Sequence, residues 1–485
     1  MSSTAEQLRG GPLGFAQIVA FADADAHVAV DHGALRQVAR GHRTFLTALG
    51  RRPVYGANTG VGANKSITVT ATASHGKRLL RSHCTAVGPL EGSDVNRVAM
   101  CIRLNQLLVG ASGISPELVE GLAVAVAAGS MPRIHQWGSV GTGDIAQLAE
   151  LALTLEGERP WMYNAVAPVS AAATDALPFM SSSAFTLARS ALATRDCLRL
   201  LQSLEDVASI TALAVAGCRD AWDPRVHTAK GHPFQLDVAR RLFDAVRPFA
   251  GDDIDDVRVQ DRFGLRTLPS VHAPAHDALA RLATAIELEC SSGSENPLVV
   301  GDDLLHHGLF HQAALAALLD HVRATVVSVL NLAAARVSML NTADLNGVSR
   351  FLATSDPGSS GLMVGEYVVQ DVLATARALA YPTSHSAISI SLGTEDHASF
   401  APQGARQLAD LTTIARVVVA TEAVAAVRAL RLHPSRQIPC RALETFGLLD
   451  AVLSHDMNDQ PMGEDLELAS TVLWDRADHR VGTRV

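Results

Sequence analysis

Apolar residues recur three or four positions apart through much of the second half of the chain. In residues 311–341 this spacing is kept by Leu315, Leu319, Val322, Val326, Val329, Ala333, Val337 and Leu340. Such a stripe is typical of a helix packed in a bundle, and a helix of this length spans roughly 45 Å at 1.5 Å per residue. Residues 403–432 predict a second long helix, which ends before Pro434, and residues 184–216 predict a third.

The first 182 residues show shorter and more varied patterns. Residues 15–30 contain strand-like pieces, whereas residues 32–49 have the spacing of an amphipathic helix that ends at Gly50. Further helices are predicted over 73–81, over 94–110 and from Pro116 onward. This part of the chain is therefore predicted to mix helices with short strands.

These patterns predict a mainly α protein in two parts. We expect a mixed N-terminal domain at 1–182 and a long-helix bundle with C-terminal helices at 183–485. The composition agrees, because apolar residues make up 48% of the chain and aromatic residues only 4%. That balance favours close-packed helices over aromatic-rich sheets.

Charge and cysteine usage exclude several classes of function. The net charge is −9 and no basic run occurs, so no nucleic-acid partner is expected. No stretch of 18 uncharged apolar residues occurs, and the N-terminus lacks a signal-peptide pattern, so neither a membrane span nor export is expected. The six cysteines are scattered without a zinc-binding spacing. We therefore predict a cytoplasmic protein with free thiols and no metal.

A glycine-rich loop at 137–149 leads into an apolar helix. Its glycines permit a tight turn, and Thr142 or Asp144 is positioned to cap the helix. A helix N-terminus presents unpaired N–H groups, which suit an anion or a group that must become electrophilic. The alternative is a purely structural capped helix.

A second glycine loop follows Tyr55 and ends at Lys65-Ser66. A phosphate-binding loop requires glycine immediately before the lysine, and Asn64 stands there, so a nucleotide site is not expected. A tyrosine held in such a loop can act as a general acid or base, although it can also be an ordinary half-buried residue.

Other single residues are ambiguous on their own. His83 could orient a substrate, Arg266 could grip a carboxylate, and Glu395 belongs to a dense polar triplet. Each could equally serve a structural or surface role. His307 and His311 have a metal-like spacing, but no paired carboxylate motif accompanies them, so no metal site is expected.

The order of motifs along the chain is more specific than any one of them. The motifs are Tyr-Gly-x-Asn-Thr-Gly-x-Gly at 55–62, Ser-His at 82–83, Gly-Ser-Val-Gly at 138–141, Gln-Asp-x-x-x-Leu-Arg at 260–266, Glu-Asn-Pro-Leu at 295–298, Phe-His at 310–311, Ser-Gly-Leu-Met at 360–363 and Glu-Asp-His at 395–397. From about residue 15 to about residue 435 the chain resembles the aromatic amino acid ammonia-lyases, most closely the histidine ammonia-lyases. The resemblance implies a histidine ammonia-lyase-like helical fold and a homotetramer in which three subunits share each active site.

The resemblance also implies roles for individual residues. Tyr55 matches the base that removes the β-proton, and Arg266 matches the arginine that holds the substrate carboxylate. His83 and Glu395 match the positions that recognise an imidazole. Phe310 matches an aromatic residue beside the electrophile, and Gln260 matches a polar residue in the nearby wall of the site.

The chain departs from the family at the catalytic electrophile. The family builds a methylidene-imidazolone ring (MIO) from Ala-Ser-Gly, but Gly141-Thr142-Gly143 stands here, one residue short and without the serine. Two further positions differ, because Phe263 replaces a tyrosine and Ser181 replaces an asparagine. No MIO is therefore expected, and the half of the site that activates the amine is changed.

These departures imply a substrate whose nitrogen leaves without help from a ring. Ring-free relatives similar to ergothionase eliminate trimethylamine from betaines. We therefore expect a lyase that releases ammonia or a methylated amine from an imidazole-bearing amino acid or betaine. The helix N-terminus at Thr142, Gly143 and Asp144 would stabilise developing negative charge. The alternatives are an ordinary ammonia-lyase with an atypical MIO, an isomerase or cyclase of a specialised pathway, and a non-catalytic binding paralogue.

Overall fold

The computed structural model describes residues 6–70, 73–247, 258–433 and 442–481. The chain divides into two compact units. The first unit consists of Met1–Ala193, Leu282–Asp320 and Pro382–Arg406, and the second of Thr194–Arg281, His321–Tyr381 and Gln407–Val485. This division differs from the expected boundary between residues 182 and 183, because two later segments of the chain belong to the first unit.

Short helices surround a buried centre in the first unit. They are α1 (Phe15–Ala20), α2 (His32–Leu49), α3 (Ala73–His83), α4 (Ser93–Leu108), α5 (Pro116–Ala127), α6 (Ile145–Leu155), α7 (Ala176–Met180) and the 3₁₀ turns η1 (Gly62–Asn64) and η4 (Ser391–Gly393). Helices α4 and α6 are buried on nearly every side, and the buried residues of α4 include the polar side chains of Arg103 and Asn105. Helix α2 has the predicted bounds, and its cap is Asp31, whose carboxylate accepts from the backbone N–H groups of Gly33 and Ala34.

Four two-stranded sheets complete the first unit. They pair β1 (Glu6–Leu8) with β2 (Val28–Val30), β3 (Val87–Leu90) with β5 (His135–Trp137), β4 (Met131–Pro132) with β6 (Trp161–Tyr163), and β7 (Leu298–Val300) with β8 (Asp303–Leu305). Only the first pair is parallel. The prediction for residues 15–30 is therefore only partly right, since α1 forms where strand-like pieces were expected.

Long helices dominate the rest of the chain. They are α8 (Ala184–Ala214), α12 (Leu268–Cys290), α13 (Ala313–Leu340) and α16 (Ala401–Leu432). Shorter elements accompany them: η2 (Arg219–Trp222), α9 (Pro224–Lys230), α10 (Pro233–Val246), α11 (Phe263–Arg266), α14 (Ala343–Asn346), η3 (Arg350–Leu352), α15 (Met363–Leu379), α17 (Ala442–Asp450) and α18 (Gly463–Val481). Three of the long helices were predicted from their apolar spacing, and every apolar position of the predicted stripe in α13 is buried. The mainly α prediction is confirmed.

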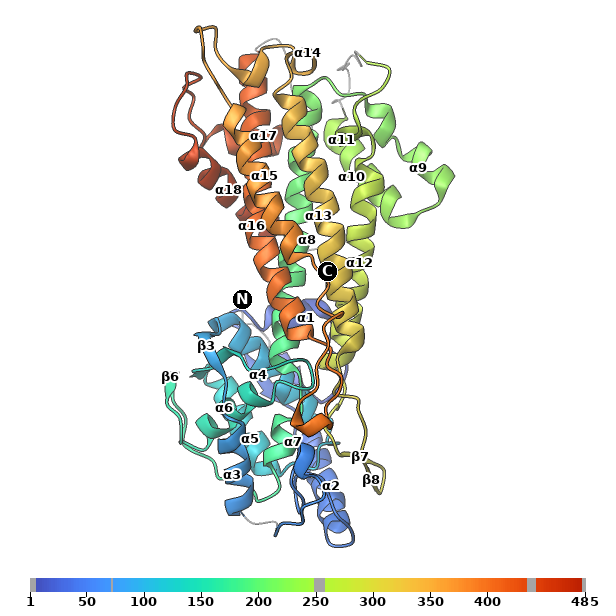
Figure 1. Cartoon of the computed structure of the whole chain (residues 1–485), viewed down its shortest axis with the longest axis vertical. Coiled ribbons are helices and arrows are strands. Elements are labelled where there is room, and N and C mark those ends of the chain that lie inside the picture. The colour runs from blue at the N-terminus through green and yellow to red at the C-terminus, as the bar shows by residue number, and fades with distance from the viewer. Residues whose placement is uncertain (1–5, 71–72, 248–257, 434–441, 482–485) are drawn as a thin grey trace. The chain divides into compact units, whose positions relative to one another are not determined.

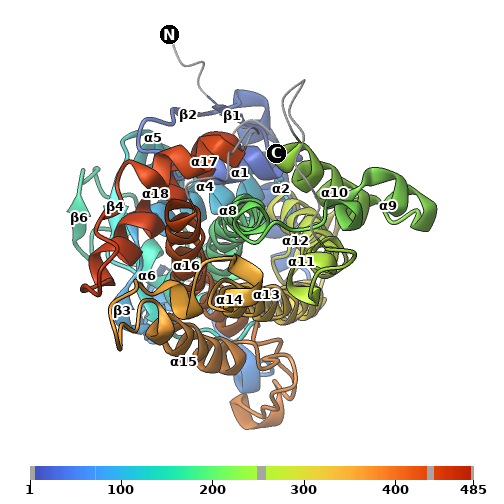
Figure 2. The same cartoon turned by 90° about the horizontal axis from the view of Figure 1, so that it is seen from above.

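The second unit has a polar centre as well as an apolar one. Within it α8, α13 and α16 run side by side (Figures 1 and 2). The fully buried guanidinium of Arg336 on α13 donates to both carboxylate oxygens of Glu422 on α16, at 2.6 and 2.8 Å. The Thr211 hydroxyl on α8 donates to the same carboxylate at 2.7 Å. Because the buried charges are paired and hydrogen-bonded, they fix how the three helices align.

Helix α13 is long and apolar enough to cross a membrane by length and composition alone, with a mean hydropathy of 1.6 and half of that window buried. It also carries Arg323 and Arg336, which are both fully buried. A core helix of a globular protein has these same properties, and α13 contributes to the bundle described above.

Candidate functional site

A cavity of about 540 Å³ lies within the first unit, in the size range of small-molecule sites. It is lined by Pro53, Tyr55, Thr59, Gly62, Lys65, Ser66, Thr142, Ile145, Leu177, Ser181, Asn296, His306, Phe310, Thr394 and Glu395. Five residues singled out from the sequence lie here together: Tyr55, Thr142, Ser181, Phe310 and Glu395. They come from five separate stretches of the chain, and the fold gathers them into one wall.

The 139–143 loop is held rigidly in place. Gly141 and Gly143 adopt φ angles of +95° and +106°, which disfavour any side chain. The Ser399 hydroxyl donates to the Gly141 carbonyl at 3.0 Å, and the Phe400 N–H donates to the Val140 carbonyl at 2.9 Å. The loop therefore presents Thr142 to the cavity in a fixed position.

Thr142 is hydrogen-bonded to a carboxylate in the cavity wall. Its hydroxyl donates to Oε2 of Glu395 at 3.2 Å, although the two residues are 253 positions apart. Because this contact uses the hydroxyl proton, the oxygens of both residues face the cavity as hydrogen-bond acceptors. This edge of the cavity is therefore suited to a ligand that carries an N–H donor.

The expected cap of α6 is different in the structure. Asp144 occupies the N-cap position, but neither its side chain nor that of Thr142 caps the helix. The buried Asp144 carboxylate instead accepts from the backbone N–H and the hydroxyl of Thr186, each at 2.8 Å. The Asp144 N–H donates to the Ser182 carbonyl at 2.6 Å. The helix start is thus occupied by internal bonds near Asp144, and the expectation of an open N-terminus is wrong at that residue.

Tyr55 lies in the cavity with its phenol oxygen in contact with the backbone. The Gly62 N–H donates to that oxygen at 2.7 Å. Burial raises the pKa of Tyr55, the Gly62 N–H lowers it, and the negative charge of Glu395 raises it further, so the net change is upward. The Gly62 bond is the contact that would stabilise a phenolate here.

A buried arginine connects two segments of the cavity wall. Arg103 on α4 donates to Glu295 at 2.7 Å and to the Phe179 carbonyl at 3.1 Å, and both charged side chains are inaccessible to solvent. Next to these partners, the Asn296 N–H donates to the Ser181 hydroxyl at 3.1 Å. The ion pair therefore ties together the two segments that bring Ser181 and Asn296 into the cavity wall.

Two other predicted residues of the first unit do not line this cavity. His83 lies at the end of α3, where its Nδ1 is 2.8 Å from the Leu79 carbonyl and 3.1 Å from the Ser82 hydroxyl. Gly143 contributes its carbonyl, which accepts from the Ser139 hydroxyl at 3.0 Å.

The predicted carboxylate clamp belongs to the second unit. The Arg266 guanidinium donates to the Gln260 amide oxygen and lies over the Phe263 ring, with 4.7 Å from its central carbon to the ring centre. The indole N–H of Trp222 donates to the Leu265 carbonyl at 2.9 Å and fixes the turn. The three predicted residues are thus neighbours, and Phe263 supports the arginine through a cation–π contact.

His306 was not predicted as a site residue, and His307 and His311 were noted only for their metal-like spacing. His306 lines the cavity, whereas His307 contacts the Glu295 carbonyl at 2.7 Å and His311 contacts His397 at 2.9 Å. Across the described ranges, no three His, Cys, Asp or Glu side chains are grouped as metal ligands. No local pattern in the sequence indicated His306, because the strand β8 that it directly follows was not predicted.

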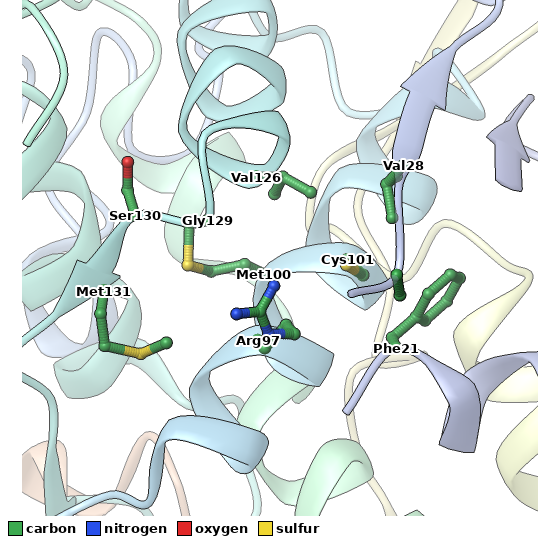
Figure 3. Close-up of a pocket in the computed structure, with 10 residues that line it drawn as sticks. Phe21, Val28, Arg97, Met100, Cys101, Val126, Gly129, Ser130 and Met131 are labelled. Atoms are coloured by element: carbon green, nitrogen blue, oxygen red, sulfur yellow. The ribbon is translucent and has the colours of Figure 1, made fainter. Parts of the chain in front are cut away.

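A second cavity in the first unit is too small for a substrate. Figure 3 shows Arg97, Met100, Cys101 and Met131 around it, and its volume of about 10 Å³ corresponds to one water molecule at most. Burial raises the pKa of the Cys101 thiol to about 12, so it remains protonated and unreactive.

Known proteins resemble the chain over almost its whole length. The sequence profile of the family described as aromatic amino acid lyase matches residues 13–448. Histidine ammonia-lyase of Geobacillus kaustophilus is 30% identical over 450 residues, which cover 88% of this chain and 89% of that enzyme.

Solved structures share the fold. Ergothionase from Treponema denticola, described as an ergothioneine-degrading enzyme, superimposes with a TM-score of 0.92 at 22% identity, covering 98% of this chain and 99% of the other. Histidine ammonia-lyase from Trypanosoma cruzi superimposes with a TM-score of 0.88 at 22% identity. The match covers 99% of this chain and 95% of the other.

Proposed function

Because the chain belongs to the aromatic amino acid lyase family, we propose that it eliminates an amine from an imidazole-bearing amino acid or betaine without an MIO. The coarser assignment, a carbon–nitrogen lyase related to histidine ammonia-lyase, follows from the family. The leaving group, the substrate and the independence from a ring are the proposal.

One observation carries the proposal: Thr142, in the shortened segment where the family has its ring-forming Ala-Ser-Gly, donates its hydroxyl to Glu395. The residues present do not fit the ring. A Cβ on Gly141, the residue before Thr142, would lie 2.1 Å from Oγ of Ser399, so the loop leaves no room for an alanine before Thr142. The loop therefore supports a binding surface rather than the precursor of an electrophile.

Without the ring, the leaving group must depart unaided. An amino group can lose a proton and become a neutral amine that does not leave. A trimethylammonium has no N–H to lose, keeps its positive charge and departs as neutral trimethylamine. In the proposed reaction Tyr55, as phenolate, takes the β-proton, the C–H electrons form the new double bond, and the Cα–N bond breaks with its electrons on the departing amine. Arg266, supplied to this cavity by another subunit of the proposed homotetramer, binds the carboxylate with its planar fork. Glu395 and Thr142 accept from the imidazole N–H.

The remaining predicted residues have supporting roles in this proposal. Phe310 packs against the substrate, Ser181 contributes a hydroxyl, and Gln260 is the polar partner of Arg266. We assign His83 to imidazole recognition in a homotetramer with shared active sites, since His83 does not line the cavity of its own chain. A cytoplasmic location is also proposed, and the five described cysteines are all free thiols, which suits a reducing compartment.

The test is amine release by the purified enzyme from histidine and its N-methylated forms. Tyr55→Phe should lower turnover by about 100-fold or more, because a positioned base contributes 10²–10⁴-fold. Tyr163→Phe, which removes a hydroxyl from an exposed strand residue of the same unit, is the matched control. Unchanged turnover in Tyr55→Phe would show that another group removes the proton.

An intact-protein mass tests the absence of the ring separately. The proposal predicts the mass of the unmodified chain, whereas an atypical MIO formed from Gly141-Thr142-Gly143 would lower it by two water molecules. A product that retains its nitrogen would instead identify an isomerase or cyclase.

A further inference from the structure

His306 and Tyr55 are brought together by a small apolar cluster. Val54, Ala57, Leu304 and the α2 residue Phe45 form a cluster that is almost completely buried. Val54 precedes Tyr55 directly, and Leu304 stands two positions before His306. The cluster therefore packs the loop that carries Tyr55 against the β7–β8 hairpin that carries His306.

A hydrogen bond from the Tyr55 backbone determines which nitrogen of a neutral His306 ring carries the proton. The Tyr55 N–H donates to Nε2 of His306 at 3.3 Å, and the two rings meet edge to face with centres 6.4 Å apart. Since Nε2 accepts a hydrogen bond, a neutral His306 carries its own proton on Nδ1. The ring is exposed to solvent and lines the cavity, so a ligand can reach it.

The surroundings of His306 favour its neutral form. Burial of part of the ring and the positive charge of Arg52 lower its pKa, and His307 acts in the same direction. Lys65 and Glu395 are the other charged groups along the same cavity. A neutral His306 is a hydrogen-bond donor with no charge to attract carboxylates in general.

We propose that His306 is a specificity-determining residue, whose Nδ1–H donates to the unprotonated ring nitrogen of a neutral imidazole substrate. The opposite ring nitrogen carries a proton and is bound by the acceptors Glu395 and Thr142. A neutral imidazole has one donor and one acceptor, so this pair of contacts selects it over an imidazolium, which has two donors, and over a phenyl ring, which has none. The inference rests on the proposed function for the identity of the substrate.

The binding of unreactive ligands tests the selectivity of His306 for an imidazole without any need for turnover. Calorimetry would compare imidazole-4-propionate with 3-phenylpropionate on the full-length wild type and on His306→Phe. The wild type should prefer the imidazole acid, and His306→Phe should lose about 10-fold of that preference, the effect of removing one hydrogen bond to the ligand. His306→Asn keeps both an acceptor and a donor and should recover part of it. The exposed His321→Asn in α13 is the control.

A pH series separates this role from a structural one. Protonation of His306 removes the acceptor for the Tyr55 N–H and adds a charge. Because partial burial and Arg52 lower the pKa of His306, imidazole binding to the wild type should weaken only below the ordinary pH range of histidine protonation. Imidazole-4-propionate protonates at its own ring in a similar pH range. The decisive quantity is therefore the difference in affinity for this ligand between the wild type and His306→Asn. That difference should shrink as the pH falls.

An unchanged ligand preference in His306→Phe, with an unchanged melting temperature, would overturn the inference. Failure of every amine-release assay would overturn the proposed function and leave the binding comparison standing.

Discussion

The loop at 139–143 allows a paired prediction about backbone and space. Gly141 and Gly143 both have positive φ angles, so alanine at either position incurs a strain of about 1–3 kcal/mol. Only Gly141 is also crowded. A Cβ there would lie 2.1 Å from Oγ of Ser399 and 2.9 Å from the backbone nitrogen of Phe400, whereas the nearest atom to a Cβ at Gly143 is 3.4 Å away.

The crowding adds a second cost for Gly141→Ala. Ser399 donates to the Gly141 carbonyl, and the Phe400 N–H is bonded to Val140, so neither neighbour can move without breaking a hydrogen bond. Overpacking of this kind costs about 1–3 kcal/mol. We therefore expect Gly141→Ala to destabilise the protein by about 2 kcal/mol more than Gly143→Ala.

Urea unfolding followed by circular dichroism measures the difference. Gly141→Ala combined with Ser399→Ala should recover part of the loss, because the closest atom is then removed. Equal destabilisation by the two glycine substitutions would refute the reasoning, since it would mean that the loop relaxes freely around residue 141.

Three other predictions concern buried groups. Arg336→Met should cost about 3–5 kcal/mol in urea unfolding because it leaves the Glu422 carboxylate buried without its ion-pair partner, and a loss below about 1 kcal/mol would contradict this. Burial lowers the pKa of His272 to about 4, so its neutral form is favoured by folding. The neutral ring therefore contributes roughly 3 kcal/mol to the free energy of unfolding above pH 6.5, and this contribution should be lost as the pH falls towards 4. Urea unfolding measured across that pH range would detect the loss. The thiols of Cys101 and Cys197, whose pKa values burial raises to about 12, should resist iodoacetamide at pH 8 until the protein unfolds, and mass spectrometry would show any modification.

Apolar periodicity was enough to predict the long helices and the mainly α class. The stripe through α13 and the amphipathic pattern of α2 are local signals, and both helices form where they were expected. The α1 segment was misread as strand because six residues are too short to show a helical period. Helix α15, at Met363–Leu379, was not predicted at all.

The cavity could be predicted only through motif order. Thr142 and Glu395 meet although they are 253 positions apart, and Tyr55 and His306 are 251 positions apart. No local pattern encodes such contacts. The Asp144 carboxylate shows the same limit, because a partner 42 positions away takes the place of the local cap that its sequence position indicated.

We propose that this lyase works without a ring because its substrate carries a good leaving group. The most direct test is to measure, with one enzyme preparation, the rates of trimethylamine release from the trimethyl betaine of histidine and of ammonia release from histidine. We expect trimethylamine and the matching unsaturated acid from the betaine, with little or no ammonia from histidine. Ammonia release from histidine at an equal or higher rate would contradict it.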